Sequence, residues 1–304
     1  PDLKLEGVLI GKKLVLENNT MESVKLNLEE STSNSTQVQI KLDKARLGDK
    51  RFKKILAFFK ITPQKINLTK SKVWPSKGLI LLAGNLKPKS GEYQIKFKGE
   101  KLQAEDLLSK HLMGPLQLSG SLAGFLPKDN DVPELSDYSR DLSGDIKIKL
   151  TDGAIPKLGM LENFLTLLNP NTALNAQKEG LSYDYLGGNF KIAKGVVHTN
   201  NFEVKSPQIN LTVTGKANLV EDTVLAQVKA MPLQMLDKTI KAIPLLGAIL
   251  GGGKKGGVIE TYFKMYGKLS QPEFTMEAHK TLTEKPGSIL KGLLNLPKNL
   301  TEGK

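Results

Sequence analysis

Glycine and lysine residues around position 254 have the spacing of a nucleotide-binding loop. Gly251, Gly253 and Gly256 match the Gly-x-Gly-x-x-Gly pattern of dinucleotide sites. Such a site needs a strand before the glycines and a helix after them, so that the pyrophosphate meets the N-terminus of the helix. Here the hydrophobic pattern predicts a helix before the glycines and a strand after them. Lys254 is followed by Lys255 rather than by Ser or Thr, which excludes a P-loop.

Metal-binding and nucleophilic side chains are sparse. The three histidines, His111, His198 and His279, are far apart, and none belongs to a His-x-x-x-His or His-Glu-x-x-His arrangement. Asp129 and Asp131 resemble the beginning of a calcium loop, but a proline occupies the third ligand position. The absence of cysteine removes thiolate nucleophiles and cysteine-based zinc sites. We therefore predict a protein that is not an enzyme, with no catalytic residue, no metal site and no cofactor.

The formal net charge of +13 raises the question of a nucleic-acid partner. Many lysines alternate with apolar residues, as in residues 93–98 and 146–150, which places them on the polar side of predicted strands. Aromatic residues make up only 6% of the chain, and the sequence has no RNA-recognition or zinc-finger motif to read bases. We expect no nucleic-acid partner. A basic surface suits the anionic headgroups of a membrane surface at least as well.

The elements that organise the chain are strands, and their clearest pattern lies toward the C-terminus. Apolar and polar residues alternate over residues 208–219, 224–230 and 259–269, which predicts half-buried strands and a sheet with one long apolar face. The candidate lining of an apolar groove is Ile209, Leu211, Val213, Val224, Ala226, Val228, Ile259, Phe263, Met265 and Leu269. The alternative is that these side chains are ordinary core, covered by amphipathic helices predicted at residues 158–168 and 233–243.

Two further helices are predicted in the first half of the chain. Over residues 51–60, Phe52, Ile55 and Phe59 recur at helical spacing among basic residues. This basic helix either plugs one end of the sheet or lies on a membrane surface. The second helix is predicted at residues 104–113.

An apolar segment at residues 243–250 is followed directly by the glycine-lysine loop. It is the longest apolar run in the chain and too short to span a membrane, and no signal peptide is recognisable. The candidate contacts to a membrane or a partner are Leu245, Leu246, Ile249, Leu250, Lys254 and Lys255. The alternative is a buried helix with a flexible exit.

Glycine followed by a polar and then an apolar residue recurs at Gly84, Gly120, Gly144, Gly215 and Gly267. Glycine inside a strand marks a bulge, a bend or a close approach of two backbones, which is how a long sheet curls. The predicted fold is therefore mainly β, a long curled antiparallel sheet that forms an apolar groove, with a few short amphipathic helices covering or capping it.

The loop at residues 127–141 is the best candidate boundary. We expect an N-terminal β-groove segment with the basic helix at 1–128, a C-terminal β segment with covering helices at 141–285, and a tail helix at 286–304. Turns are predicted at Gly11, at residues 18–19 and at residues 31–36.

Residues 186–274 resemble the C-terminal region of AsmA-like bacterial envelope proteins. The resemblance rests on LGGNFKIAKG, on the strand VTGKANL at residues 213–219, on PLLGAILGGG, and on the final strand MYGKLSQP at residues 265–272. It implies a repeating β-groove of the lipid-transfer type in the periplasm, tethered to the inner membrane by a segment upstream of Pro1. It implies no catalytic residues.

The resemblance and the apolar pattern lead to the same expected function. We expect non-enzymatic binding and transfer of phospholipid between the inner and outer membranes, with phospholipid, a membrane surface or another envelope protein as partners. The alternative is a structural or assembly factor for outer-membrane proteins or envelope biogenesis. Transfer needs an open apolar face, whereas a scaffold needs a closed core and a protein-sized patch.

Overall fold

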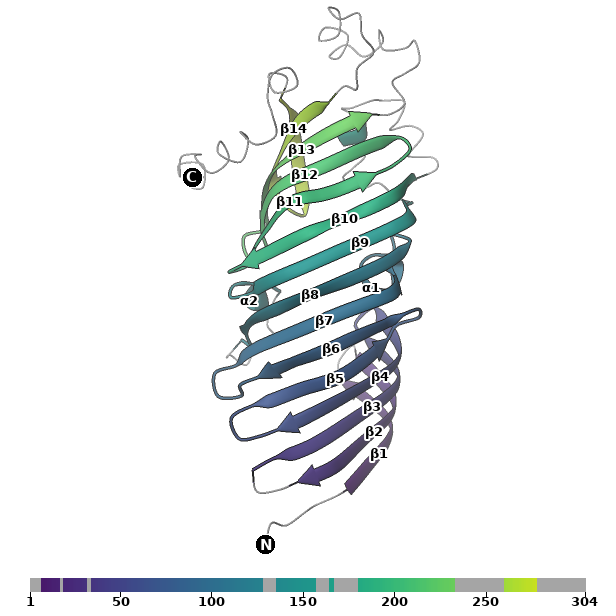
Figure 1. Ribbon diagram of the computed structural model, residues 1–304, viewed down its shortest axis with the longest axis vertical. Helices are drawn as coiled ribbons and strands as arrows, with labels where there is room; N and C mark the ends of the chain where they lie inside the picture. The colour runs from purple at the N-terminus through teal and green to yellow at the C-terminus, as the bar shows by residue number, and fades with distance from the viewer. Residues whose placement is uncertain are drawn as a thin grey trace, which may run out of the picture.

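The described residues form one continuous β-sheet. The computed structural model describes residues 7–16, 19–31, 34–127, 135–156, 164–166, 180–232 and 260–277. Fifteen strands form an antiparallel sheet in which strand order follows chain order from β1 to β15 (Figure 1). The first and last strands do not pair with each other, so the sheet is not closed into a barrel. The predicted mainly β, curled antiparallel fold is confirmed.

Each strand pairs only with its neighbours in the chain. The strands are β1 (Gly7–Leu16), β2 (Asn19–Ser31), β3 (Thr36–Leu47), β4 (Lys50–Ile61), β5 (Ile66–Trp74), β6 (Leu79–Leu86), β7 (Glu92–Gln103), β8 (Pro115–Phe125), β9 (Ser143–Ile155), β10 (Leu181–Ala193), β11 (Val196–Lys205), β12 (Ile209–Asn218), β13 (Thr223–Pro232), β14 (Thr261–Lys268) and β15 (Gln271–Met276). The described residues contain three short helical segments: α1 (Ala104–Leu107), α2 (Leu135–Ser139) and residues 164–166. Figure 1 shows α1 and α2 halfway along the sheet, near opposite ends of the strands.

The sheet continues across the loop at residues 127–141. β8 pairs with β9 from Leu116 opposite Leu150 to Ala123 opposite Ser143. The strands before and after this loop therefore belong to one hydrogen-bonded ladder.

Two local predictions from the sequence are wrong, and a third, the helix at 104–113, is confirmed only in its first turn. Residues 51–60 form strand β4 and not a basic helix, because β4 pairs with β3 along its whole length and with β5 beyond Lys54. Its apolar residues occupy both faces around position 57, so the sequence pattern fits the period of a strand and the period of a helix equally well. Hydrogen bonding to the neighbouring strands makes the segment a strand. The helix predicted at 104–113 ends at Leu107, and the chain rejoins the sheet where Met113 bridges to Ala154.

Gly11 is not a turn. It lies inside β1, opposite Val24 of β2. The two other predicted turns are confirmed, since the first break in the ladder falls between Leu16 and Asn19 and the second between Ser31 and Thr36. A glycine followed by lysines therefore does not by itself end a strand in this chain.

Two β-bulges, each at a lysine with a left-handed backbone conformation, keep apolar side chains on the same face of the sheet. Lys70 in β5 and Lys101 in β7 have φ angles of 46° and 55°. At each, the register shifts by one residue, between Leu68 and Ser71 and between Gly99 and Leu102. A bulge places two residues opposite one, so the residues before and after it point to the same side of the sheet.

Four of the recurring glycines lie where neighbouring backbones approach closely. A Cβ atom added at Gly84, Gly120, Gly144 or Gly215 would come closer than 3 Å to a backbone atom of the adjacent strand. Gly267 differs, because the nearest atom to its added Cβ is a carboxylate oxygen of Glu273 at 3.8 Å, and its φ angle of 90° is what favours glycine there. The predicted close approach is confirmed at the first four positions.

Alanine at Gly120 should destabilise the sheet. The added methyl group would meet the carbonyl oxygen of Asp145, and forcing an atom into a packed site costs about 1–3 kcal/mol. Chemical denaturation of Gly120→Ala should show a loss of this size. The matched control is Gly11→Ala, whose added Cβ meets only the Cβ of Val24 at 3.9 Å. Equal losses in both variants would contradict the role assigned to Gly120.

Candidate functional site

One face of the sheet carries an uninterrupted line of apolar residues. Following register partners from strand to strand gives one residue from each of the fifteen strands, and none is polar or charged. We call this line the apolar row: Gly7, Leu28, Val38, Phe59, Leu68, Gly84, Ile95, Leu122, Gly144, Ile192, Val197, Ala217, Val224, Gly267 and Pro272. The face that contains it is called the apolar face below.

The opposite face is polar. Partners one position away include Lys96, Ser121, Asp145, Lys191 and His198, which follow one another from β7 to β11. Four of these five side chains are exposed, and Ser121 is half-buried. The alternation seen in the sequence therefore separates an apolar from a basic, hydrated surface.

Part of the apolar face is closed. A second line of partners from β7 to β14 is buried throughout, with no residue more than 8% exposed: Leu102, Leu116, Leu150, Leu186, Val204, Leu211, Ala230 and Thr261. The helical turn at residues 164–166 packs onto this region. Its Phe164 ring lies 5.1 Å from the ring of Phe263, edge to face, and 4.8 Å from the ring of Phe274. We call Phe164 and Leu165, each 1% exposed, the plug.

The remainder of the apolar face is accessible. In the apolar row, Val38, Phe59, Leu68 and Leu122 are half-buried, and Ile95 is 36% exposed. Exposure of contiguous apolar side chains to water is unfavourable unless another surface covers them. From β3 to β8, the described residues therefore leave the part of the apolar face around the apolar row uncovered.

The structure places most of the predicted lining residues on the apolar face, at its closed end. The buried members are Ile209, Leu211, Val224, Ala226, Val228 and Phe263, and the half-buried members are Val213 and Met265. Leu269 lies in the turn between β14 and β15, where its backbone N–H donates to the carbonyl oxygen of Asp222. The following predicted contacts lie outside the described residues: Ile259, Leu245, Leu246, Ile249, Leu250, Lys254 and Lys255.

Of the predicted helices in the second half, only residues 164–166 are described, and they are helical. The segment 233–243 and the tail at 286–304 lie outside the described residues. The accessible lining in the first half, such as Phe59, Leu68 and Ile95, was missed by sequence reasoning. Its signal is the same period of two, obscured where bulges interrupt the alternation.

The buried tyrosines serve as structural hydrogen-bond donors. Tyr183 donates to the carbonyl oxygen of Met113 at 2.6 Å, and Tyr262 donates to a carboxylate oxygen of Glu260 at 2.9 Å. Burial raises the pKa of each to about 12, and the nearby carboxylates of Glu105 and Glu260 add to the shift. Neither hydroxyl ionises near neutral pH, so neither supplies a base.

Two further features are absent from the described residues, namely a cluster of metal ligands and a membrane-spanning helix. Within the described part of the chain, no three His, Asp or Glu side chains are grouped to hold a metal ion. No described helix has the length and hydropathy needed to cross a bilayer.

An open antiparallel sheet with one apolar face along its whole length defines a class of groove-forming β-sheet proteins. Comparison with protein families matches residues 2–274 to the family described as YhdP protein. The chain therefore belongs to the YhdP protein family, which is part of the AsmA-like and TamB-like group of bacterial envelope proteins. The resemblance found in the sequence is confirmed at the level of this group. No curated protein and no solved structure matches the chain.

Truncating the plug should uncover the closed end of the apolar face. Phe164→Ala removes the ring contacts with Phe263 and Phe274, and loss of a buried phenylalanine typically costs about 3–5 kcal/mol. We expect a lower denaturation midpoint and stronger fluorescence of a hydrophobic dye. Phe125→Ala is the control, since Phe125 is 46% exposed. If both variants behave alike, Phe164 does not close this face.

Proposed function

We propose that this chain binds lipid on its apolar face and transfers phospholipid between the inner and outer membranes of the bacterial envelope. The observation that carries the proposal is the apolar row, which crosses all fifteen strands without a polar residue and is only half-buried in the first half of the sheet. Membership of the YhdP family supports it, because this group of proteins belongs to the envelope.

The dimensions of the apolar row suit a lipid track. Fourteen spacings of about 4.8 Å between neighbouring strands give a path of roughly 65 Å, about twice the hydrocarbon thickness of a bilayer. Burying each methylene of an acyl chain contributes about 0.8 kcal/mol. An acyl chain is thus held without a specific pocket and slides at little cost, because neighbouring positions on the row are chemically alike.

The remaining parts of the proposal concern location and partners. The protein acts in the periplasm, tethered to the inner membrane by a segment outside this chain, and it is not an enzyme. Phospholipid, a membrane surface and another envelope protein are the proposed partners. The basic polar face supports a position near anionic headgroups.

A second function is favoured by the edge of the sheet. Three consecutive residues of β1, Val8, Leu9 and Ile10, are 61%, 65% and 74% exposed, and β1 has only β2 as a partner. An unpaired, apolar edge strand is a template for an added strand. This edge suits a structural or assembly factor that docks another envelope protein.

A charge on the apolar row should reduce lipid retention. Ile95→Asp places a carboxylate in the accessible part of the row, at a side chain that is 36% exposed and therefore tolerates the change better than a core position. Native mass spectrometry of the purified chain, followed by lipid extraction, should show several-fold less phospholipid per protein. Gln94→Asp introduces the same charge at an exposed residue one position away.

Three results are informative. Loss of lipid in Ile95→Asp but not in Gln94→Asp, with unchanged circular dichroism, supports the apolar face as the lipid site. A folded Ile95→Asp variant with normal lipid content would rule it out. A wild-type chain that is stable and lipid-free would favour the assembly factor.

A further inference from the structure

Apolar side chains interrupt the polar face of the sheet between β4 and β7. Register partners on this face follow one another from β3 to β7: Lys41, Leu56, Lys72, Leu81 and Lys98. Leu56 and Phe59, a member of the apolar row, are three residues apart in β4, so they point to opposite faces of the sheet. Lysine and leucine therefore alternate from strand to strand along one line of the polar face.

A tryptophan extends this mixed surface. Trp74 is two residues from Lys72 in β5, which places both side chains on the same face. Its register partner in β4 is Lys54, whose ammonium lies 5.3 Å from the centroid of the indole ring. Lys96 is two residues from Lys98 in β7 and also belongs to this face. We call the following residues the mixed patch: Lys54, Leu56, Lys72, Trp74, Leu81 and Lys96.

The apolar members of the mixed patch are accessible. Leu81 is 42% exposed, and Leu56 and Trp74 are half-buried. Apolar surface that faces water is unfavourable, and covering it by another surface removes that cost. A partner that fits the mixed patch therefore offers apolar contact as well as negative charge.

Described carboxylates do not neutralise the cations of the mixed patch. Lys54, Lys72 and Lys96 form no ion pair with any described residue, and Lys72 and Lys96 are exposed. Next to them, Lys98 pairs with Glu100 at 2.6 Å, so this pair adds no net charge. An anionic surface opposite the mixed patch would meet three cations that no described carboxylate neutralises.

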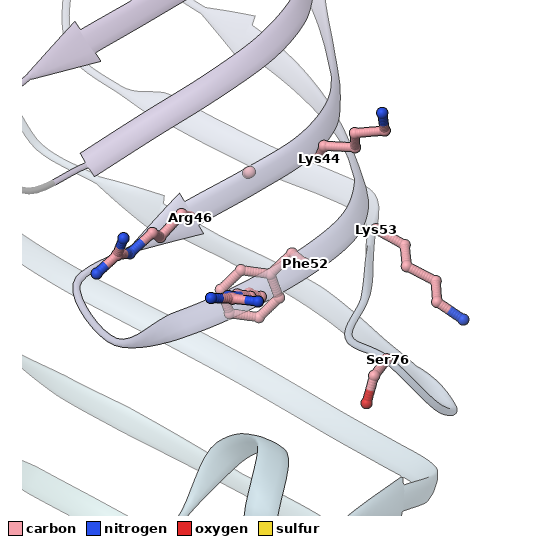
Figure 2. Close-up of a pocket in the computed structure, with 7 residues that line it drawn as sticks. Lys44, Arg46, Phe52, Lys53 and Ser76 are labelled. Atoms are coloured by element: carbon pink, nitrogen blue, oxygen red, sulfur yellow. The ribbon is translucent and has the colours of Figure 1, made fainter.

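The hairpin between β3 and β4 adds positive charge beside the mixed patch. Arg46 and Arg51 are exposed register partners, one position from the buried Ala45 and therefore on the polar face. A pocket of about 250 Å³ lies at this hairpin, and its surface is almost entirely apolar. Figure 2 shows Lys44 and Lys53 extending to one side and Arg46 to the other. The charged ends of these side chains point away from the pocket and add to the charge of the surrounding surface.

An anionic bilayer surface matches both properties of the mixed patch. Its phosphates attract lysines, and each lysine near the surface strengthens binding by roughly five-fold. Its headgroup region accepts the indole ring of tryptophan, which is apolar over most of its area and carries one N–H donor. A leucine side chain reaches the adjoining hydrocarbon. A polyanion without apolar surface would satisfy the lysines alone.

The mixed patch lies behind the accessible part of the apolar face. Strands β4 to β7 carry the mixed patch on one face and the apolar row from Phe59 to Ile95 on the other (Figure 1). Only the sheet itself separates the two, a thickness of roughly 10 Å. A bilayer on the mixed patch therefore lies close to the apolar row without covering it.

We propose that the mixed patch docks this protein onto the surface of an anionic phospholipid bilayer. The lysines meet the phosphates, Trp74 lies at the level of the headgroups, and Leu81 enters the boundary with the hydrocarbon. This inference rests on the proposed function, which includes a membrane surface as a partner, and it adds the face that makes the contact. The apolar face stays free to hold lipid while the opposite face is docked.

Trp74 is the only tryptophan in the chain, so its fluorescence reports on the mixed patch without a label. The full chain is titrated with vesicles of equimolar phosphatidylglycerol and phosphatidylcholine, and separately with vesicles of phosphatidylcholine alone. We expect the anionic vesicles to shift the emission to shorter wavelength and to protect Trp74 several-fold from quenching by acrylamide. Phosphatidylcholine alone should leave the emission unchanged. Vesicle flotation measures binding in parallel.

Removal of two lysines from the mixed patch should weaken docking. K72Q/K96Q should lower the apparent affinity for anionic vesicles about thirty-fold, the scale expected for two lysines at an anionic surface. The control K191Q/K216Q removes the same charge from exposed lysines on the polar face of β10 and β12. Neighbouring strands are rotated by roughly 20°, so β10 and β12 face a different direction from β5, and the control should bind as the wild type does. Circular dichroism checks that both variants are folded.

The outcomes separate this inference from the proposed function. A chain that retains lipid in native mass spectrometry but binds no vesicle overturns the docking inference and leaves lipid binding intact, whereas absence of both overturns both. Vesicle binding without a change in Trp74 emission places the contact on another surface, and equal losses in both double variants assign it to overall charge. Either result overturns the mixed patch. Dextran sulfate is a polyanion without apolar surface, and if it shifts the emission as far as vesicles do, the bilayer assignment is wrong.

Discussion

Strand register is the constraint on which the apolar face depends. Side chains alternate between the two faces of a strand, so a slip of one residue would move a whole apolar set to the polar face. In a sheet of fifteen strands in series, each register is inherited by the next. The bulges at Lys70 and Lys101 absorb one extra residue each, at a backbone cost of about 1–3 kcal/mol per left-handed residue. The two bulges keep Leu68 and Leu102 on the apolar face, and the packing of these side chains offsets the local strain.

Local pattern predicted most of this fold, and non-local contacts explain what it missed. Alternation with a period of two is a local property, and it predicted β12, β13 and β14 from residues such as Val213, Val224 and Phe263. Around Phe58, apolar residues occupy both faces, so the pattern is ambiguous and pairing with β3 and β5 decides. The pairing of Arg46 with Arg51 also needed the register, which a single strand does not reveal.

The degree of covering could not be predicted either. Val224 and Val38 occupy equivalent places on the apolar row, yet Val224 is 7% exposed and Val38 is half-buried. Covering depends on what packs on the sheet, as at Phe263, which Phe164 reaches from a segment about a hundred residues away in the chain. Alternation shows that a residue faces inward, but it carries no information on whether another segment lies above it. Sequence reasoning accordingly left core and groove as alternatives for the lining residues.

The order of the strands has a consequence for how such a protein changes in length. Every strand is hydrogen-bonded only to its neighbours in the chain, with no crossover in the described sheet. Inserting or deleting one hairpin would leave every other pairing intact and alter the sheet by two strand widths, roughly 10 Å. Adding two strands leaves the direction of the following strand unchanged, whereas adding one would reverse it. The sheet can therefore lengthen by one hairpin at a time, but not by a single strand. In a meander of this kind, duplication or loss of hairpins can therefore change the length of the sheet without altering its other pairings.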